Sequence, residues 1–590
     1  MKAAEAYDSI QKEEGKKGDQ LKVRTNLIVT LRLLSFFGFV GFIYLAFTIS
    51  EWMMLPMLAT LIAFLLLIRA HGKARFLRDK ALARKRMSSR ELEMLAGDLS
   101  SFDGGQAPPP EHNYAHDLDV FGSNSLYQVL NRAFSPGGIR RVRQQLLNAP
   151  VKPKEMAEWQ EAAKSLSKED EHRIAVIASA SQLDIKASTL DSLMTWLGEK
   201  QTRSFQWVKP FLYLVPAYSV ALIILASLSV ISVNMCILGL MLPLGLVGAN
   251  LKHTNHIYQE LGKQGKSLEQ LADLIAEVCA GTTSDTRSTK IREELTQAEA
   301  ASRRLATILS AYDQRNNIFA SIVTNALYLA ELRNAWLVTK WKNTYGKEFQ
   351  DWLNSLSEYE LLVSLGTFAR NHEGLICWPE SNASAEVEGE ALIHPLLAFK
   401  KVVANDLSLT NEKKVELITG ANMAGKSTYL RTVGLSVLLA QIGAPVLGSS
   451  FKLGDLQLFT SMRTEDALDS GTSYFMAELK RLNRLVETIN EDQCTFALLD
   501  EILKGTNSLD KEQGSRAFIE KLLQRNVRVV VATHDVSLTT LEQSYPAQIE
   551  NHHFASEVKG EDLTFDYRMR SGVCDTMNAT WLMRSMGLID

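Results

Sequence analysis

Long uncharged stretches interrupt the polar first half of the chain. Residues 210–251 contain no Asp, Glu, Lys or Arg, and residues 33–49 and 52–68 form a second uncharged pair around a turn at Ser50 and Glu51. A bilayer-spanning helix needs about 20 apolar residues, so the stretch 210–251 is long enough for two crossings. A helix over 33–49 or over 52–68 would measure roughly 26 Å, near the short limit for a hydrocarbon core. We predict two transmembrane helical hairpins rather than buried helices of a soluble protein.

Basic residues flank both hairpins and are missing from both tips. They gather between Lys12 and Arg32 and between Arg69 and Arg86 around the first hairpin, and include Lys209 and Lys252 beside the second. By the positive-inside rule, the chain is expected to be a multi-pass protein of a bacterial-type inner (cell) membrane, with both termini and all large segments in the cytoplasm. The first apolar run starts late and a second follows directly, so a cleaved signal peptide is not expected.

The remaining segments differ in the spacing of their apolar residues. Before residue 373 the spacing is helical, and residues 318–344 are expected to form one helix. After residue 373 short β-rich segments appear, and from Val415 strands alternate with helices, which predicts a parallel sheet covered by helices. The expected segments are a polar, frayed N-terminal tail (1–25), a transmembrane hairpin with a basic helix (26–99), a Gly/Pro/Ser-rich linker (100–116), a first helical core part (117–206), a transmembrane hairpin (207–251), a second helical part or lever (252–372) and an α/β domain (373–590).

Composition sets limits on the function. A chain of 590 residues is expected to contain three or more structural units. Its formal net charge of −3 leaves no global electrostatic footprint for nucleic acid, so any DNA contact must come from local basic patches. The five cysteines are scattered without a C-x-x-C pair, which favours a reducing compartment and no structural zinc or disulfide framework.

The segment from Gly420 to Thr428 fits the pattern G-x-x-x-x-G-K-[ST]. An apolar strand leads into glycines that let backbone N–H groups curl around phosphate oxygens, and the helix that follows points its positive end at the anion. Lys426 would supply a cation to the β- and γ-phosphates, and Ser427 a hydroxyl to Mg²⁺. The alternative is an ordinary strand–turn–helix corner. We predict a nucleotide site.

Two further apolar strands end in polar residues of matching chemistry. Residues 495–499 lead into Asp500 and Glu501, and residues 527–532 lead into Thr533 and His534. In phosphate-loop enzymes the first carboxylate holds the Mg²⁺ shell and the next can orient or deprotonate the attacking water. A polar residue at the carboxyl end of a strand lies where open α/β sheets bind ligands, so His534 could sense the γ-phosphate. An acidic turn and a structural histidine are the alternatives.

A longer pattern connects these motifs. Residues 459–478 contain D…S-G-x-S-x-F-M-x-E, between the phosphate loop and the later L-x-D-E-x-x-x-G-T and A-T-H motifs. With these four motifs in order, residues 415–590 resemble the MutS family of DNA mismatch-repair ATPases. Residues 390–397 are also similar to that family's approach to its ATPase domain, and residues 117–150 to the start of its helical core.

The resemblance implies an ABC-ATPase-like P-loop domain, C-terminal to an all-α core, that binds ATP with Mg²⁺ and hydrolyses it. It implies a homodimer through the ATPase domains, because Ser473 would reach the γ-phosphate held by the opposite protomer. ATP would then hold the two ATPase domains together, and its hydrolysis would let them separate. The implied nucleotide-binding residues are Gly420, Ala421, Asn422, Met423, Ala424, Gly425, Lys426, Ser427, Thr428 and Ser473; the metal ligands are Ser427 and Asp500; and the catalytic residues are Glu501, Lys426 and the switch residue His534.

The chain also departs from the family. Ala421 replaces the usual Pro and Ala424 a usual Gly, both small enough to preserve binding, while Val402 replaces an aromatic residue that stacks on adenine in many members. The mismatch-reading domain with its Phe-x-Glu wedge is not visible, and the second hairpin falls near the place of the family's DNA clamp. Neither a separate clamp nor a long C-terminal dimerisation tail is found. ATP chemistry therefore transfers better than mismatch recognition.

Two functions follow as expectations. The first is a membrane-anchored MutS-like ATPase that binds mismatched or branched DNA in repair or recombination, with basic clusters at 140–143 and 303–304 as candidate phosphate contacts. Solvated helix faces are the other interpretation of those clusters. The second is an ATP-driven membrane mechanoenzyme without nucleic acid. A transporter is disfavoured because L-S-G-G-Q is missing between Lys426 and Asp500 and the apolar spans carry no charge.

Overall fold

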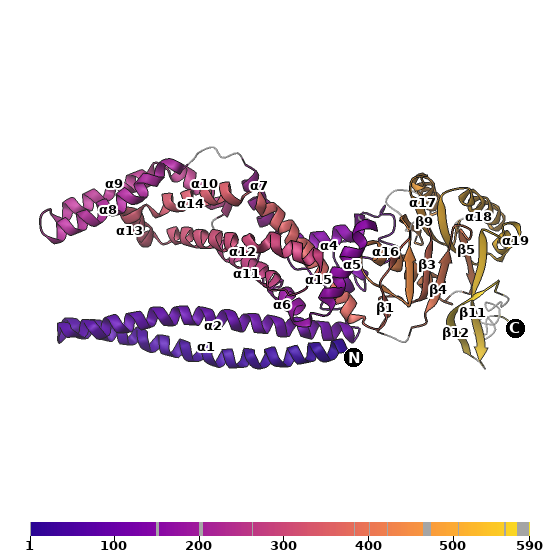
Figure 1. Cartoon of the computed structure of the whole chain (residues 1–590), viewed down its shortest axis with the longest axis horizontal. Helices are drawn as coiled ribbons and strands as arrows, with labels where there is room; N and C mark the ends of the chain where they lie inside the picture. Colours follow the sequence, from indigo (N-terminus) through magenta and orange to yellow (C-terminus); the bar gives the residue numbers. More distant parts are fainter. Residues whose placement is uncertain are drawn as a thin grey trace.

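The protein is elongated, with an α/β domain at one end and two helical hairpins reaching toward the other (Figure 1). A helical body lies between them and connects both hairpins to the α/β domain. The computed structural model describes residues 2–148, 153–199, 205–261, 264–382, 384–399, 402–421, 423–463, 474–504, 507–559, 562–574 and 589.

The first hairpin consists of α1 (Lys2–Thr48) and α2 (Met54–Leu95), joined by the short 3₁₀ helix η1 (Glu51–Met53). The Ser50 hydroxyl accepts a hydrogen bond from the Trp52 amide and so caps the turn at the tip. Large apolar side chains on the outer part of the hairpin are exposed; Phe47, at 89%, and Trp52, at 77%, are examples. The outer part thus presents an apolar surface to its surroundings.

Residues 2–25 were expected to be a frayed polar tail, and this expectation is wrong. They form the first turns of α1, and Tyr7 is fully buried against the helical body. The Tyr7 hydroxyl donates a hydrogen bond of 2.9 Å to Asn371 Oδ1 and lies 3.3 Å from Arg173 Nη2. The segment is helical because Tyr7 and its neighbours on one face pack against parts of the helical body that are distant in sequence.

Removing the Tyr7 hydroxyl is expected to destabilise this docking. In Tyr7→Phe, Asn371 Oδ1 and Arg173 lose a partner in a buried site, which costs about 1 to 2 kcal/mol. The midpoint of thermal unfolding of the detergent-purified protein, followed by circular dichroism, should therefore fall. Tyr545→Phe removes a hydroxyl at the surface of the α/β domain and is the matched control. Equal midpoints for the two variants would contradict the buried contact.

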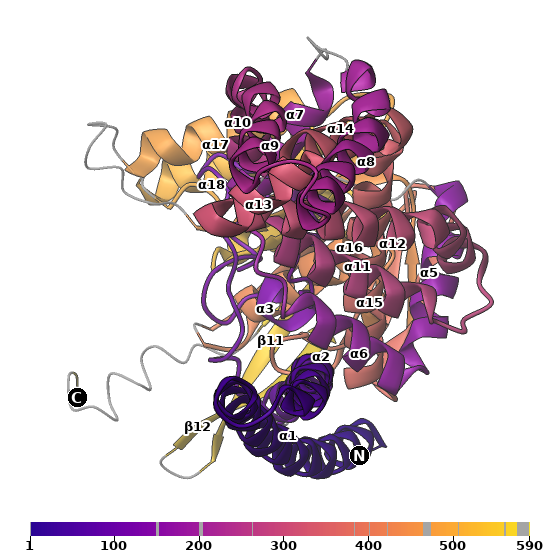
Figure 2. The ribbon, with the colours of Figure 1, turned by 90° about the vertical axis from the view of Figure 1, so that its left-hand side faces the viewer.

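The second hairpin consists of α8 (Val208–Ser227), preceded by η2 (Phe205–Trp207), and α9 (Val233–Gly248). After α9 the chain bends by 58° into α10 (Leu251–Leu261). Within the part of the chain that the structure describes, α1, the segment Glu51–Leu95 and α8 are long and apolar enough to cross a membrane, and the bent α9–α10 pair would be a fourth span. Both hairpins extend toward the same end of the molecule (Figure 1), and the end-on view separates them (Figure 2).

The body is helical, as the apolar spacing predicted. The long helix α15 (Glu348–Asn371) is buried along most of its length and packs against α4, α5 and α12. Arg132 and Glu91 form a fully buried ion pair, and Asn371 Nδ2 donates to Glu91 Oε2 at 2.8 Å, which joins α2 to α15. The remaining elements of the body are α3 (Leu126–Leu130), α4 (Pro136–Asn148), α5 (Pro153–Ser167), α6 (Asp170–Ala180), α7 (Ala187–Gly198), α11 (Gly265–Cys279), α12 (Thr286–Asp313), η4 (Gln314–Asn316), α13 (Ile318–Tyr328) and α14 (Ala330–Tyr345).

The segment that was expected to form one helix in the body forms two helices, α13 and α14. The segment 318–344 breaks at Leu329, which adopts a left-handed conformation (φ 54°) between α13 and α14. Leucine rarely adopts this conformation, so local packing must hold it there. Apolar spacing continues across the break and therefore did not reveal it.

The α/β domain is built on a six-stranded sheet with strand order β12-β11-β5-β10-β9-β8. Strands β8 to β11 and β5 are mutually parallel, and β12 is antiparallel to β11. The parallel strands at the centre are continuous apolar runs because both faces are covered. The strands are β5 (Val415–Gly420), β8 (Leu456–Ser461), β9 (Cys494–Asp500), β10 (Val527–Ala532), β11 (Ile549–Lys559) and β12 (Asp562–Ser571).

Helix α16 (Lys426–Gln441) is almost wholly buried and contacts the large sheet as well as β3 and β6. The smaller strands form a sheet of order β2-β7-β3-β4 and a β1–β6 pair. They are β1 (Ile376–Cys377), β2 (Glu380–Ser381), β3 (Val387–Leu392), β4 (Asn405–Leu409), β6 (Val446–Leu447) and β7 (Ser450–Leu453), and the other helices of the domain are α17 (Tyr474–Thr488), α18 (Ser508–Leu523), η6 (Val536–Thr540) and α19 (Leu541–Ser544). The expected sheet with helices on its faces is confirmed.

Candidate functional site

The loop between β5 and α16 has the backbone that the glycine pattern predicted. Gly420 has φ 142° and Gly425 φ 111°, both in the region that favours glycine. A Cβ atom on Gly420 would lie 2.7 Å from the Phe554 carbonyl oxygen, so the position also requires glycine for space. Met423 is left-handed too (φ 67°) and its side chain is 86% exposed. Asn422, a predicted nucleotide contact, lies outside the described residues.

Helix α16 begins at this loop with Gly425 as its N-cap and no side-chain cap. The amides of its first turn, which includes Lys426, Ser427 and Thr428, have no carbonyl partner within the helix. They stand at the positive end of the helix dipole. Ala424 is fully buried, as the small side chain allows. This end of α16 can therefore accept an anion.

Lys426 is 5% exposed and points back into the loop. Its Nζ donates hydrogen bonds to the carbonyl oxygens of Gly420 (2.8 Å) and Ala421 (3.0 Å). Burial lowers the pKa of Lys426, and the nearby carboxylates of Asp500 and Glu501 oppose this effect. The loop thus holds a largely buried ammonium group among carbonyl oxygens.

Ser427 and Asp500 meet at the end of neighbouring elements. The Ser427 hydroxyl, in the first turn of α16, donates to Asp500 Oδ2 at the end of β9, with an oxygen–oxygen distance of 2.6 Å. A hydroxyl and a carboxylate side by side are the ligands that Mg²⁺ uses when phosphates and water complete its shell. The donor set therefore fits the predicted magnesium site.

Glu501 and His534 form a contact across two adjacent strand ends. Glu501 has a left-handed backbone (φ 56°), and its amide donates to the Ala532 carbonyl at 2.8 Å. His534 Nε2 lies 3.0 Å from Glu501 Oε1, and this hydrogen bond, supported by Lys504, lowers the pKa of Glu501 to about 2. His534 Nε2 is also 3.2 Å from Lys426 Nζ. One ring nitrogen cannot donate to Glu501 and accept from Lys426 at once, so its proton decides which contact is a hydrogen bond.

Glu478, on α17, holds the turn that follows Glu501, and the sequence did not reveal this role. Its carboxylate accepts from the Leu503 amide (2.5 Å) and the Lys504 amide (3.0 Å). Burial raises the pKa of Glu478, against these hydrogen bonds. The turn needs support because Leu503, like Glu501, is left-handed (φ 59°). Glu478 ends the S-G-x-S-x-F-M-x-E pattern, but its sequence neighbours do not indicate that it binds the amides of Leu503 and Lys504.

Tyr567, on β12, is a second residue that sequence reasoning missed. Its ring covers the loop, since Cδ1 lies 3.2 Å from the position of a Cβ on Gly425. Tyr567 is 48% exposed and left-handed (φ 57°), and Asn405 Nδ2 donates to its carbonyl at 3.0 Å. The β11–β12 hairpin therefore forms one wall of the site. Ser473, the predicted contact across a dimer, lies outside the described residues.

Four arginines of the predicted basic clusters contact other groups of the chain. Arg303 pairs with Asp273 and Glu299, and Arg140 lies 3.5 Å from Asp191. The guanidinium of Arg141 lies 5.7 Å from the centre of the Trp159 ring, and Arg143 Nε donates to a backbone carbonyl. These side chains already have partners within the chain.

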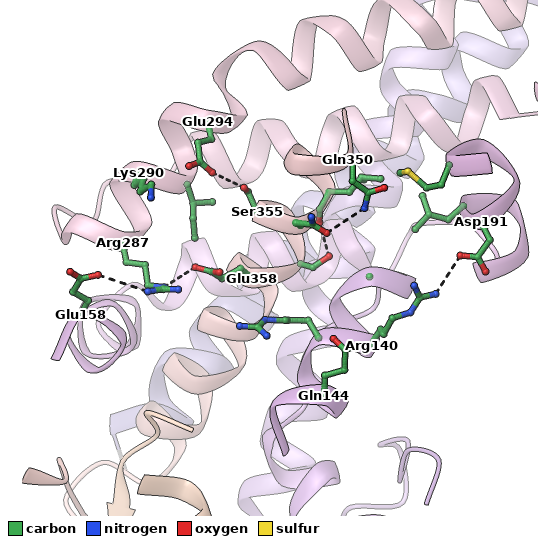
Figure 3. Close-up of a pocket in the computed structure, with 18 of the residues that line it drawn as sticks. Arg140, Gln144, Glu158, Asp191, Arg287, Lys290, Glu294, Gln350, Ser355 and Glu358 are labelled. Carbon is green, nitrogen blue, oxygen red and sulfur yellow. Dashed lines mark hydrogen bonds and ion pairs between the residues drawn. The ribbon is translucent and has the colours of Figure 1, made fainter. Parts of the chain in front are cut away.

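A cleft of about 510 Å³ lies between α4, α5, α7, α12 and α15 in the helical body (Figure 3). Basic and acidic side chains line it in equal number: Arg140, Arg141, Arg287 and Lys290 against Glu158, Asp191, Glu294 and Glu358. Arg287 bridges Glu358 at 2.7 Å, and Ser355 donates to Glu294 at 2.6 Å. The balance of charges makes this cleft a poor cradle for a phosphate backbone.

Residues 416–582 match the model of MutS domain V. Three curated relatives, each named DNA mismatch repair protein MutS, show the extent of the similarity. The protein of Thermotoga neapolitana is 36% identical over 186 residues, or 31% of this chain and 23% of its own. That of an Exiguobacterium species is 33% identical over 235 residues (39% and 27%), and that of Ruminiclostridium cellulolyticum 36% identical over 230 residues (38% and 26%).

The chain thus spans about a quarter of the length of these curated relatives. The matched region contains the 420–428 loop, the Asp500–Glu501 pair and His534, and the resemblance seen in the sequence is confirmed. The α/β region that holds the site is therefore similar to MutS domain V, and this region carries the similarity of the chain to the MutS proteins.

Proposed function

We propose that this protein is a membrane-anchored ATPase of the MutS type, which binds ATP with Mg²⁺ between two copies of its α/β domain and hydrolyses it. The observation that carries the proposal is the convergence of Lys426, Ser427 and Asp500, with Glu501 and His534, at the carboxyl ends of β5, β9 and β10. Open parallel sheets bind ligands at this edge.

The chain's own groups would hold a triphosphate in a defined way. Phosphate oxygens would replace the carbonyls of Gly420 and Ala421 as acceptors for Lys426, with a stronger, charge-assisted bond. The first-turn amides of α16 would bind the same anion. Ser427 and Asp500 would hold Mg²⁺, which neutralises phosphate charge when bound.

Glu501 and His534 are placed to act on the attacking water. A carboxylate with a pKa of about 2 is a weak base, so Glu501 is better suited to orient water than to remove its proton. Because His534 contacts Glu501 and also lies next to Lys426, it can link the state of the phosphate end to the water-positioning end. This is the switch role that the family resemblance implied.

The remaining parts of the proposal extend to partners. Ser473 is proposed to contact the γ-phosphate of the opposite protomer, so that ATP joins two domains and hydrolysis releases them. The two apolar hairpins are proposed to cross a bacterial-type inner (cell) membrane, with the α/β domain in the cytoplasm, because both point away from that domain toward one end (Figure 1). Mismatched or branched DNA is the proposed partner, in keeping with the named function of the curated relatives.

A membrane mechanoenzyme without nucleic acid is the second candidate. The balanced charges of the cleft and the internal partners of Arg140 and Arg303 favour it. ATP hydrolysis in lipid nanodiscs, with homoduplex, mismatched and branched DNA at low and high salt, separates the two. Salt-dependent binding and a change in hydrolysis rate support the DNA-binding function. Unchanged hydrolysis and no binding at low salt would support the mechanoenzyme.

Glu478→Gln is expected to slow hydrolysis through the turn that carries Glu501. The amide side chain can accept only one of the two N–H bonds at full strength, a loss of about 1 to 2 kcal/mol. If that loss falls on the transition state, kcat drops about tenfold while KM for ATP changes little. Glu487→Gln, on the exposed side of α17, is the control. A raised KM at normal kcat would instead place Glu478 in nucleotide binding.

A further inference from the structure

Helix α13 is a short apolar element that the spans described above do not include. It runs from Ile318 to Tyr328, and no charged residue occurs between Arg315 and Glu331. Its length of about 16 Å is half of a hydrocarbon core, so it cannot cross a membrane. One face is strongly exposed, with Phe319 at 84% and Ile318 at 71%, and continues through Ile322 and Val323. A soluble protein rarely leaves such a face uncovered.

The buried face of α13 is fixed to the second hairpin. The helix packs against α8 and α9, and the Ser219 hydroxyl of α8 donates to the Ala326 carbonyl at 3.0 Å. Below it, Leu329 and Leu332 join Val215 and Val247 in an apolar cluster that is separate from the main core. Figures 1 and 2 both place α13 beside α8 and α9. Its exposed side chains therefore extend the apolar surface of that hairpin.

Several polar side chains at and within α13 have hydrogen-bond partners inside the protein. Asn317 Oδ1 accepts from the Ala320 amide, and Thr324 donates to the Ala320 carbonyl at 2.7 Å. Asn325 Nδ2 donates to Ser321 Oγ at 3.2 Å, and Asn325 Oδ1 accepts from the Glu331 amide at 2.8 Å. The left-handed turn at Leu329 is fully buried, and its amide donates to the Asn325 carbonyl. Irregular backbone at membrane depth is tolerated under these conditions.

Charged groups lie where the chain enters and leaves this element. Glu331 is 4% exposed; it lies 3.0 Å from Arg315 and accepts from Thr254 at 2.7 Å. The Arg315 guanidinium also lies 4.7 Å from the centre of the Tyr258 ring. An ion pair with aromatic neighbours at the base of an apolar element is typical of a membrane–water boundary. The chain enters α13 from η4 and leaves it into α14, so both ends of α13 connect to the helical body on the same side of that boundary.

We propose that α13 is a re-entrant membrane helix, whose exposed face contacts the acyl chains of the bilayer leaflet next to the helical body. The inference rests on the proposed membrane insertion of α8 and α9, since a bilayer around the hairpin would also reach Phe319 and Ile322. A protein partner is the less economical occupant, because it would also have to cover the outer faces of α8, which is long and apolar enough to span a bilayer, and of α9. The α12–α13–α14 segment thus dips into the membrane and returns.

Collision measurements with spin labels test this placement. The full chain, with its five native cysteines replaced, carries one label at Phe319→Cys in lipid nanodiscs. Leu238→Cys, at an exposed position of α9, is the lipid reference, and Thr307→Cys, on the exposed side of α12, is the water reference. Phe319→Cys is expected to match Leu238→Cys, with a ratio of oxygen to water-soluble nickel collisions several-fold above that of Thr307→Cys.

The other outcomes separate two failures. Lipid contact at Leu238→Cys with water contact at Phe319→Cys would overturn the re-entrant helix and leave the membrane hairpins intact. Water contact at Leu238→Cys would overturn the membrane proposal and this inference with it. Shielding of Phe319→Cys from both reagents, with dipolar broadening between labels, would assign the face to a second copy of the chain and also overturn the inference.

Discussion

Replacing Glu501 by Gln is expected to reduce ATP hydrolysis by about 100-fold or more, with ATP binding nearly unchanged. Glutamine keeps the size of the side chain but not the negative charge that accepts the hydrogen bond from His534 and would orient the water. The proposed nucleotide contacts from Lys426, Ser427 and the first turn of α16 would remain. The variant should therefore accumulate in the ATP-bound form. Single-turnover hydrolysis and nucleotide binding, measured separately, check both halves of the expectation.

The dimer gives a second readout for this variant. If ATP joins two α/β domains, Glu501→Gln should remain dimeric with ATP under conditions in which the unmodified protein returns to monomers, as measured by light scattering in detergent. Glu491→Gln, an exposed glutamate just before β9, is the matched control and should behave like the unmodified protein. Normal turnover in Glu501→Gln would show that another group positions the water.

The pH profile offers an independent check on Glu501. Its pKa of about 2 lies below the ordinary value, so the charged form persists as the pH falls from neutrality to about pH 5. Any loss of hydrolysis over that interval must come from a different group. The contribution of the Glu501–His534 contact to stability is fully present above the ordinary carboxyl pKa and is lost as the pH falls from there through about 2.

Lys426→Ala is expected to weaken ATP binding about 10- to 100-fold. A hydrogen bond to a charged group contributes about 1.5 to 3 kcal/mol, and each 1.4 kcal/mol is a factor of ten in Kd. Titration of a fluorescent ATP analogue into the detergent-purified protein measures the change.

The control for this change is Lys452→Ala, which removes an exposed lysine from β7 that pairs loosely with Glu388. It should leave Kd for ATP as in the unmodified protein. If Lys426→Ala bound ATP as tightly as this control, the 420–428 loop would not be the phosphate site, and the proposed function would fail with it.

The features that could be predicted from the sequence are those whose chemistry and spacing are local. The glycines at positions 420 and 425 are required by backbone conformations within one loop. The apolar strand before Asp500 and Glu501 can be recognised from its own residues, and so can its polar end. Parallel strands then bring their carboxyl ends to one edge, so the meeting of Ser427 with Asp500 follows from topology. The same reasoning failed at Tyr7 and Leu329, where the decisive contacts come from other helices.

The uncharged spans, the division into a helical and an α/β part, and the residues of the candidate site could be read from the amino-acid sequence, because each depends on neighbours a few positions apart. Three features appear only in the folded chain: α1 docks through Tyr7, Glu478 holds the turn after Glu501, and α13 packs against the second hairpin. These features depend on side chains that meet across tens to hundreds of residues, and such contacts leave no periodic signal in the chain.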